Sequence, residues 1–294
     1  MLLAGLAVMI VSELATIAGL EPFASWNTPI CWTGFILFAD ALVYRARGRS
    51  WIRSSPREFA ALALASIPLW IVFEGFNVAL RNWHYTGLPE NPALRLFGYA
   101  WSFATVSPAI FEGAELVAVV RAGKAGGAGQ AGGIRNQPAL PAPPARPATP
   151  ALSSSIGALM LAFPFFVTPD VAQYMAAPVF LGFIFLLDPI NRRLGEESLA
   201  GDLAHGRNDR LINLLVSGLV CGVLWEFWNY WARAKWHYNV PIMEHLKVFE
   251  MPLPGYLGFP PFALECFTMY VFVRALCRRL HVLDGTQPGH TIAL

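Results

Sequence analysis

The sequence predicts an all-α integral membrane protein of about eight transmembrane helices, arranged as two tandem, parallel four-helix repeats. Hydrophobic residues make up 55% of the chain and charged residues only 14%, well below the share of about a quarter that is typical of soluble domains. Long apolar stretches recur along the chain, and one group of polar residues occurs twice. Membrane lipids are the expected surroundings, and the small net charge of +2 gives no indication of nucleic-acid binding.

The apolar stretches form two groups of four. A helix needs about 20 apolar residues to cross the hydrocarbon core. The first stretch has no basic beginning and contains Glu13, so we interpret it as a retained helix and not as a signal peptide. The fifth stretch is short and contains Pro164, which leaves its full crossing open. The predicted spans are residues 2–20, 29–44, 59–80, 96–120, 154–167, 171–190, 211–231 and 255–277.

Basic residues set the predicted orientation. Lys and Arg are concentrated after the second, fourth and sixth spans and at the end of the eighth. Because such residues favour the cytoplasmic side, both termini are predicted to be cytoplasmic, most simply at a bacterial inner membrane. Residues 122–152 are rich in Ala, Gly and Pro and are predicted to form a flexible linker. The two membrane repeats are then residues 1–121 and 153–294.

The repeated polar group ends the third span of each predicted repeat. A Glu, an Asn and an Arg at positions i, i+3 and i+7 share one helix face, so they are predicted to form a polar stripe. The Trp-His-Tyr triplet that follows is typical of an interfacial anchor, while its His also allows proton relay. The matching pairs are Glu74 and Glu226, Asn77 and Asn229, Arg81 and Arg233, His84 and His237, Asp40 and Asp188, Pro108 and Pro261, and Glu112 and Glu265.

Four glutamates are the candidate catalytic residues: Glu112, Glu265, Glu74 and Glu226. A charge in the hydrocarbon costs about 2.5 to 3.5 kcal/mol, so each buried acid indicates either a functional site or a bond between helices. Glu112 and Glu265 each follow a proline by one turn, which makes room for a side chain or ligand. Glu74 and Glu226 remain open between a hydrogen-bond chain at the helix end and an acid that holds a proton in an apolar pocket.

No metal and no cofactor are predicted. The four cysteines lie singly in apolar runs, without the spacing of a zinc site or a disulfide framework. Helical dinuclear sites use Glu-x-x-His, and Glu112 and Glu265 have no His three residues on. Phosphate-loop, GxSxG, HExxH and Rossmann motifs are also missing from the sequence. Asp40 and Asp188 are predicted to form helix-end ion pairs with Arg45 and Arg193.

Several of these motifs also carry a family resemblance. They are Asp188 with Arg193, Trp225-Glu226, Trp236-His237-Tyr238, and Pro261-x3-Glu265 followed by Phe267 and Tyr270, with partial counterparts in the first repeat. In this order of elements each repeat resembles the membrane-integral lycopene cyclases and the related carotenoid hydratases, a family that includes tandem forms. The family places two adjacent glutamates after the proline, whereas this chain has one.

The resemblance implies a redox-neutral reaction on a long isoprenoid. An acid protonates a polyene, the cation closes a ring or takes water, and a base removes a proton. Glu112 and Glu265 are the first acid and base candidates, and aromatic faces are expected to stabilise the cation. The predicted substrate-binding residues are Asn77, Asn229, Arg81, Arg233, His84, His237, Trp228, Trp231 and Phe267.

Two other classes of protein remain open. A transporter or a lipid- or quinone-binding protein would use the polar stripes to hold a head group, since parallel repeats are also a transporter architecture. A structural scaffold would use the same acids only to join helices. The substrate identity and the oligomeric state are not determined by these patterns.

Overall fold

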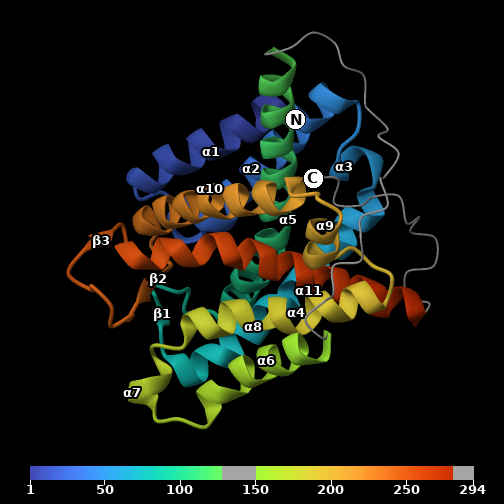
Figure 1. Cartoon of the computed structure of the whole chain (residues 1–294). Helices are drawn as coiled ribbons and strands as arrows, with labels where there is room; N and C mark the ends of the chain where they lie inside the picture. Colours follow the sequence, from blue (N-terminus) through green and yellow to red (C-terminus); the bar gives the residue numbers. More distant parts are fainter. Residues whose placement is uncertain (128–149, 281–294) are drawn as a thin grey trace.

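The computed structural model describes residues 1–127 and 150–280 and is mostly helical (Figure 1). The longer helices are α1 (Leu2–Ile17), α2 (Phe23–Arg47), α4 (Pro56–Leu80), α5 (Pro92–Gly127), α6 (Pro150–Ala162), α8 (Ala176–Arg193), α10 (Asp209–Trp231) and α11 (Phe259–Arg279). Short helices are α3 (Trp51–Ser54), α7 (Pro169–Ala172), α9 (Leu199–Ala204), η1 (Phe163–Phe165) and η2 (Leu253–Gly258). The strands are β1 (Trp83–Thr86), β2 (Lys235–Tyr238), β3 (Lys247–Val248) and β4 (Met251–Pro252).

Four helical segments of the described chain are long and apolar enough to cross a membrane: Pro56–Leu80, Pro92–Gly123, Asp209–Trp231 and Leu253–Arg279. Helices also lie within the other four predicted ranges, but α1 and the α6–η1 segment are shorter than a full span. The sixth predicted span is interrupted, because α7 ends at Ala172 and α8 begins only at Ala176. The helical, membrane-type character is therefore confirmed for four segments.

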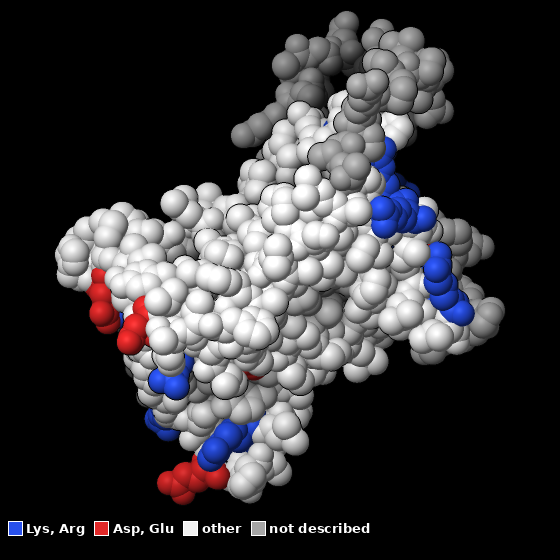
Figure 2. All heavy atoms as spheres, turned by 60° about the horizontal axis from the view of Figure 1, so that its bottom comes forward, with Lys and Arg blue, Asp and Glu red and all other residues white. Residues whose placement is uncertain are grey.

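The outer surface has the charge distribution of a membrane protein. On the face drawn in Figure 2, Lys and Arg gather at one end, and Asp and Glu gather with further basic residues at the opposite end. A wide uncharged band separates the two ends. Large hydrophobic side chains are also exposed on the helices, such as Leu14, Val78 and Leu159. Apolar surface on this scale indicates contact with lipid.

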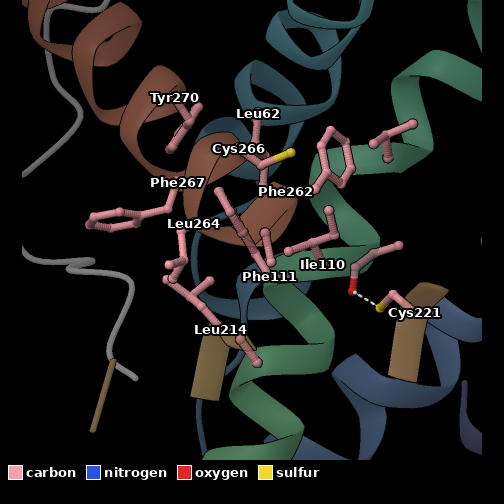
Figure 3. Packing of buried hydrophobic residues seen from close by; sticks show 14 of the residues in the cluster. Leu62, Ile110, Phe111, Leu214, Cys221, Phe262, Leu264, Cys266, Phe267 and Tyr270 are labelled. Carbon is pink, nitrogen blue, oxygen red and sulfur yellow. Dashed lines mark hydrogen bonds between the residues drawn. The ribbon is translucent and has the colours of Figure 1, made fainter. Parts of the chain in front are cut away.

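The helices pack as one continuous series. In space, α1 lies against α2, followed by α5, α10, α11, α8 and α6, and α4 lies against both α5 and α11. One buried apolar cluster spans both halves of the chain, with Phe111 of α5, Leu214 of α10 and Phe267 of α11 fully buried (Figure 3). The halves therefore share one core.

Two helix pairs make the same close contact through glycine. A Cβ on Gly5 of α1 would lie 2.5 Å from the backbone oxygen of Gly34 in α2. A Cβ on Gly157 of α6 would lie 2.4 Å from the backbone nitrogen of Leu186 in α8. Small residues allow helix backbones to approach this closely.

The predicted linker is shorter in the structure. α5 continues to Gly127 and α6 begins at Pro150, so both ends of the predicted 122–152 segment are helical. The rest of the predicted linker, 128–149, lies outside the described residues.

The strands β1 and β2 join the two halves at one end of the helices, opposite to α3 and α9 (Figure 1). They are antiparallel, and His84 pairs with His237, while Trp83 pairs with Tyr238 and Tyr85 with Trp236. The pairing is thus symmetric about the two histidines. The all-α prediction missed these strands, in which the Trp-His-Tyr triplets satisfy each other's backbone groups.

Candidate functional site

An aromatic cavity lies beside the β1–β2 strand pair. Its volume is 470 Å³, within the range of about 300–1,000 Å³ of small-molecule sites. Residues of α4, α8, α10, α11 and η2 form its other walls, and no charged residue of the described chain lines it. The rings that line it are Trp70, Phe73, Trp83, Tyr85, Tyr174, Phe180, Trp225, Trp236, Tyr238, Phe259 and Phe262.

One buried carboxyl group reaches this cavity through Tyr238. The Tyr238 hydroxyl donates a 2.9 Å hydrogen bond to Oε1 of Glu226, and Trp236 Nε1 donates to the same hydroxyl at 2.9 Å. Glu226 is fully buried, and its Oε2 has no hydrogen-bond partner among the described residues. Burial raises the pKa of the Tyr238 phenol well above its usual value, and the neighbouring Glu226 raises it further. The phenol therefore stays protonated.

The second carboxyl group reaches the cavity through Tyr85. Oε1 of Glu74 accepts hydrogen bonds from Tyr85 at 2.5 Å, from Trp70 Nε1 at 2.9 Å and from Trp83 Nε1 at 3.2 Å. Burial raises the pKa of the Tyr85 phenol, and the nearby Glu74 adds to this effect. Glu74 and Glu226 thus occupy corresponding places, but they differ in the number of donors.

The difference in donors distinguishes the two acids chemically. Oε1 of Glu74 accepts from three donors, all of them aromatic side chains. Glu226 has one donor and an unpartnered oxygen in a fully buried site, where an ionised carboxylate is costly. The two carboxyl groups therefore lie in unlike surroundings.

A smaller cavity of 70 Å³ lies on the other side of the same aromatic wall. Trp70, Tyr85, Trp225 and Trp236 line both cavities. The rings of Trp70 and Trp225 lie 5.4 Å apart. The aromatic partition therefore separates an open cavity from a nearly filled one.

Asn77 and Asn229 serve as identical clamps between a helix and a strand. Asn77 donates to the Trp83 carbonyl at 2.8 Å and accepts from the Trp83 amide at 3.2 Å. Asn229 donates to the Trp236 carbonyl at 2.9 Å and accepts from its amide at 3.0 Å. Both amides thus hold strand backbone, and in the described chain neither is hydrogen-bonded to the glutamate one turn earlier.

The arginines of the predicted stripes point elsewhere. Arg81 has a φ of +55° and ends α4 as its C-cap, on the surface. Arg233 lies beyond the end of α10 and forms an exposed ion pair with Glu21 at 2.5 Å. In the described residues, no salt bridge joins either arginine to the glutamate of its own stripe.

The histidines lie on the strand pair without lining the cavity. Their rings stack with centroids 5.6 Å apart. His237 contacts Glu250 at 2.9 Å and Thr86 Oγ1 at 3.1 Å, and His84 contacts Asn239 at 3.1 Å. Alternation along a strand turns them away from the face that carries Trp and Tyr.

Glu250 ties the segment after β2 to this strand pair. It accepts hydrogen bonds from Lys235 at 2.9 Å and from His237. Burial alone would raise the pKa of Glu250, but the hydrogen bonds and positive charges of Lys235 and His237 outweigh it, and the pKa is lowered.

The fourth-span glutamates lie in the core and line none of the described cavities. Glu112 and Glu265 are both fully buried. Glu112 lies near enough to Asp40 and Glu115 for their charges to act on it. Both oxygens of Glu265 lack a hydrogen-bond partner among the described residues.

The aromatic residues predicted to stabilise a cation also lie outside the cavity. Trp228 is buried edge-on against Trp32, with centroids 4.7 Å apart. The Phe267 ring lies 5.2 Å from the Arg210 guanidinium. Trp231 is 48% exposed at the end of α10.

Asp40 and Asp188 cap short helices in place of the predicted ion pairs. Asp40 accepts from the Ile52 amide of α3 at 2.9 Å, and Asp188 accepts from the Leu199 amide of α9 at 2.6 Å. No ion pair with Arg45 or Arg193 is present in the described part of the chain. An acid at a helix N-terminus is favoured by the unpaired amides there.

The described chain contains no group of three or more His, Cys, Asp or Glu side chains placed to hold a metal ion. Sequence reasoning missed most of the ring-bearing walls of the cavity, above all Trp70 and Phe262. It did single out the triplets that supply Tyr85 and Tyr238, because these are repeated. The distant contacts that assemble the cavity leave no local pattern.

Comparison with known proteins adds no relative. No protein-family model matches the chain, and neither a curated protein nor a solved structure matches it.

Proposed function

We propose that this protein is a membrane enzyme that isomerises a long isoprenoid by acid–base catalysis in the aromatic cavity. The observation that carries the proposal is that Tyr85 and Tyr238 line one apolar cavity and are each bonded to a glutamate, Glu74 and Glu226. Such a pair of carboxyl groups in unlike surroundings suits proton donation at one site and removal at another.

The proposed reaction balances without an oxidant or reductant. The Tyr238 hydroxyl first turns its hydrogen from Glu226 toward the cavity, so that the protonated Glu226 can donate to it. Glu226 then passes its proton to the Tyr238 oxygen while the Tyr238 proton moves to a polyene carbon. The π electrons of a neighbouring double bond then attack the cation and close a ring. Tyr85 takes a proton from the adjacent carbon as its own moves to Glu74, and a new double bond forms. The cycle ends when this proton returns to Glu226.

The walls of the cavity fit such an intermediate. Aromatic faces attract a cation, and an apolar enclosure keeps water from trapping it. The ring centroid of Trp70 lies 5.9 Å from those of Phe73 and Phe262, and the centroids of Phe73 and Phe262 lie 5.5 Å apart. A volume of 470 Å³ is expected to take one end of a long polyene.

The proposal includes an architecture of two copies of a unit with four membrane spans. It is supported by the pairing symmetric about His84 and His237, by the matching Asn77 and Asn229 clamps, and by the matching glycine contacts. An even number of spans gives both units the same orientation, with both termini on the basic, cytoplasmic side.

Pigment analysis tests the function. The protein is expressed in cells that make a linear carotenoid, and the products are separated and identified by absorption and mass. We expect a product of unchanged mass and altered absorption. Tyr238→Phe is expected to lower its formation by about 10²- to 10⁴-fold, as for loss of a general acid. Tyr256→Phe is the matched control, because Tyr256 does not line the cavity. Equal product from both variants would refute the proposed role of Tyr238.

A binding protein for a hydroxylated lipid or quinol is the second candidate. It is favoured by Asn82, which lines the cavity and is 2% exposed, and whose Oδ1 has no hydrogen-bond partner in the described chain. Such an oxygen suits a hydroxyl donor. Mass spectrometry of lipids extracted from the purified protein would then detect a retained ligand, with no new product in cells.

A further inference from the structure

The aromatic cavity has a mouth made of exposed apolar side chains. Four large residues both line the cavity and remain exposed: Tyr174 at 49%, Leu181 at 36%, Ile242 at 42% and Leu257 at 78%. A residue can meet both conditions only where the cavity reaches the surface. None of the four carries a charge.

The mouth lies between the start of α8 and η2. Ala177 and Leu181 lie four residues apart on one face of α8, and Tyr174 lies in the turn just before this helix. Leu257 and Gly258 belong to η2 on the other side, and a Cβ on Gly258 would lie 3.7 Å from the Phe180 ring of α8. η2 and α8 therefore face each other across the opening.

The corresponding place in the first half of the chain is largely filled by side chains. The sequence separation between Trp26 and Tyr174 equals that between the matching residues Asp40 and Asp188. Trp26 is therefore the counterpart of Tyr174 in the first half. Its ring packs on Phe97 at 5.4 Å and on Trp101 at 6.2 Å, and it covers Gly98. The cavity behind this cluster holds only 70 Å³.

We propose that the open mouth is a lateral portal through which an apolar polyene moves from the bilayer into the cavity. An apolar rim disfavours loading from water and suits a chain that is already dissolved in lipid. η2 also begins the candidate membrane segment Leu253–Arg279, which places one side of the mouth at the edge of the hydrocarbon. The portal rests on the proposed function only in that the cavity takes an isoprenoid.

Two arginine substitutions in η2 test the portal. Leu253 and Leu257 are both exposed, at 52% and 78%, but only Leu257 lines the cavity. The full-length protein is reconstituted into phosphatidylcholine vesicles, and all-trans-retinol is added as an isoprenoid polyene. Loading is followed as quenching of tryptophan fluorescence, since Trp70 and Trp225 line the cavity. Leu257→Arg is expected to slow loading by about tenfold, and Leu253→Arg to leave it unchanged.

The other outcomes overturn the portal. Equal loading rates in the two variants, or a wild-type protein that takes up no retinol, would contradict it. Should Leu257→Arg fail to fold, Ala177→Trp blocks the opposite side, with Phe185→Trp as the control on the exposed surface of α8, outside the cavity. Loading that depends on Leu257, without pigment conversion, would overturn the proposed enzymatic function and leave the portal. Pigment conversion with equal loading rates in the two variants would overturn the portal alone.

Discussion

The imidazole rings of His84 and His237 stack 5.6 Å apart, and the two residues are direct partners in the β1–β2 register. The two pairs that flank them are related by exchange of the two halves, since Trp83 opposes Tyr238 and Trp236 opposes Tyr85. This relationship brings both tyrosines, each hydrogen-bonded to a glutamate, to one cavity.

The asparagine clamps are expected to stabilise the junction between helix and strand. Asn229→Ala leaves the half-buried amide and carbonyl of Trp236 without their partner, which costs about 1 kcal/mol or more for a polar group removed from water. Thermal unfolding in detergent should show a lower midpoint for Asn229→Ala and for Asn77→Ala. Asn239→Ala is the control, because Asn239 is exposed. An unchanged midpoint for both clamp variants would contradict their structural role.

The glycine contacts are expected to tolerate no side chain. Gly157→Ala places a methyl group 2.4 Å from the Leu186 nitrogen, and the forced separation of α6 and α8 should cost roughly 1–3 kcal/mol. Gly75→Ala in α4 meets no atom within 4 Å and should instead stabilise the helix by up to about 1 kcal/mol. Unfolding midpoints of the two variants should move in opposite directions. An unchanged or raised midpoint for Gly157→Ala would show that close packing at Gly157 is unimportant.

The Glu250 contacts give a pH dependence to the segment between β2 and β4. The pKa of Glu250 is lowered from its ordinary value of 4.5, so its stabilising effect is complete above pH 4.5 and is lost as the pH falls through the lowered pKa. Hydrogen exchange of residues 239–252, corrected for intrinsic rates, should therefore rise between about pH 6 and about pH 3.5. Glu250→Gln should exchange fast throughout. Glu244→Gln is the control, since Glu244 is exposed and, within the described residues, forms its one ion pair with Lys247, at 4.0 Å.

Glu265 is expected to be replaceable without loss of the proposed activity. Its carboxyl group is fully buried, has no hydrogen-bond partner in the described chain and lines no described cavity, so Glu265→Leu should raise stability by about 1–3 kcal/mol. Unfolding midpoint and pigment formation are measured together. Loss of pigment with retained stability would restore Glu265 as the catalytic acid. Glu226→Gln is the comparison, and it should abolish pigment formation.

Several features could be predicted from the sequence because they depend on local composition. Apolar runs such as residues 59–80 and 211–231 predicted α4 and α10, and the repeated Glu, Asn and triplet motifs indicated where the site lies. The roles within the motif could not be predicted in the same way. Helical spacing placed Asn229 beside Glu226, yet the free backbone of Trp236 is the partner that it binds. Arg233 likewise pairs with Glu21, far away in the sequence.

By itself, the sequence determined a helical chain with membrane-type helices and two copies of one polar motif, since apolar length and spacing act within single segments. Only the tertiary structure decided that the triplets pair as strands, that tyrosines connect Glu74 and Glu226 to a cavity, and that Glu112 and Glu265 lie outside it. The physical reason is that a cavity and its mouth are formed by side chains from distant helices, whose packing no local pattern records.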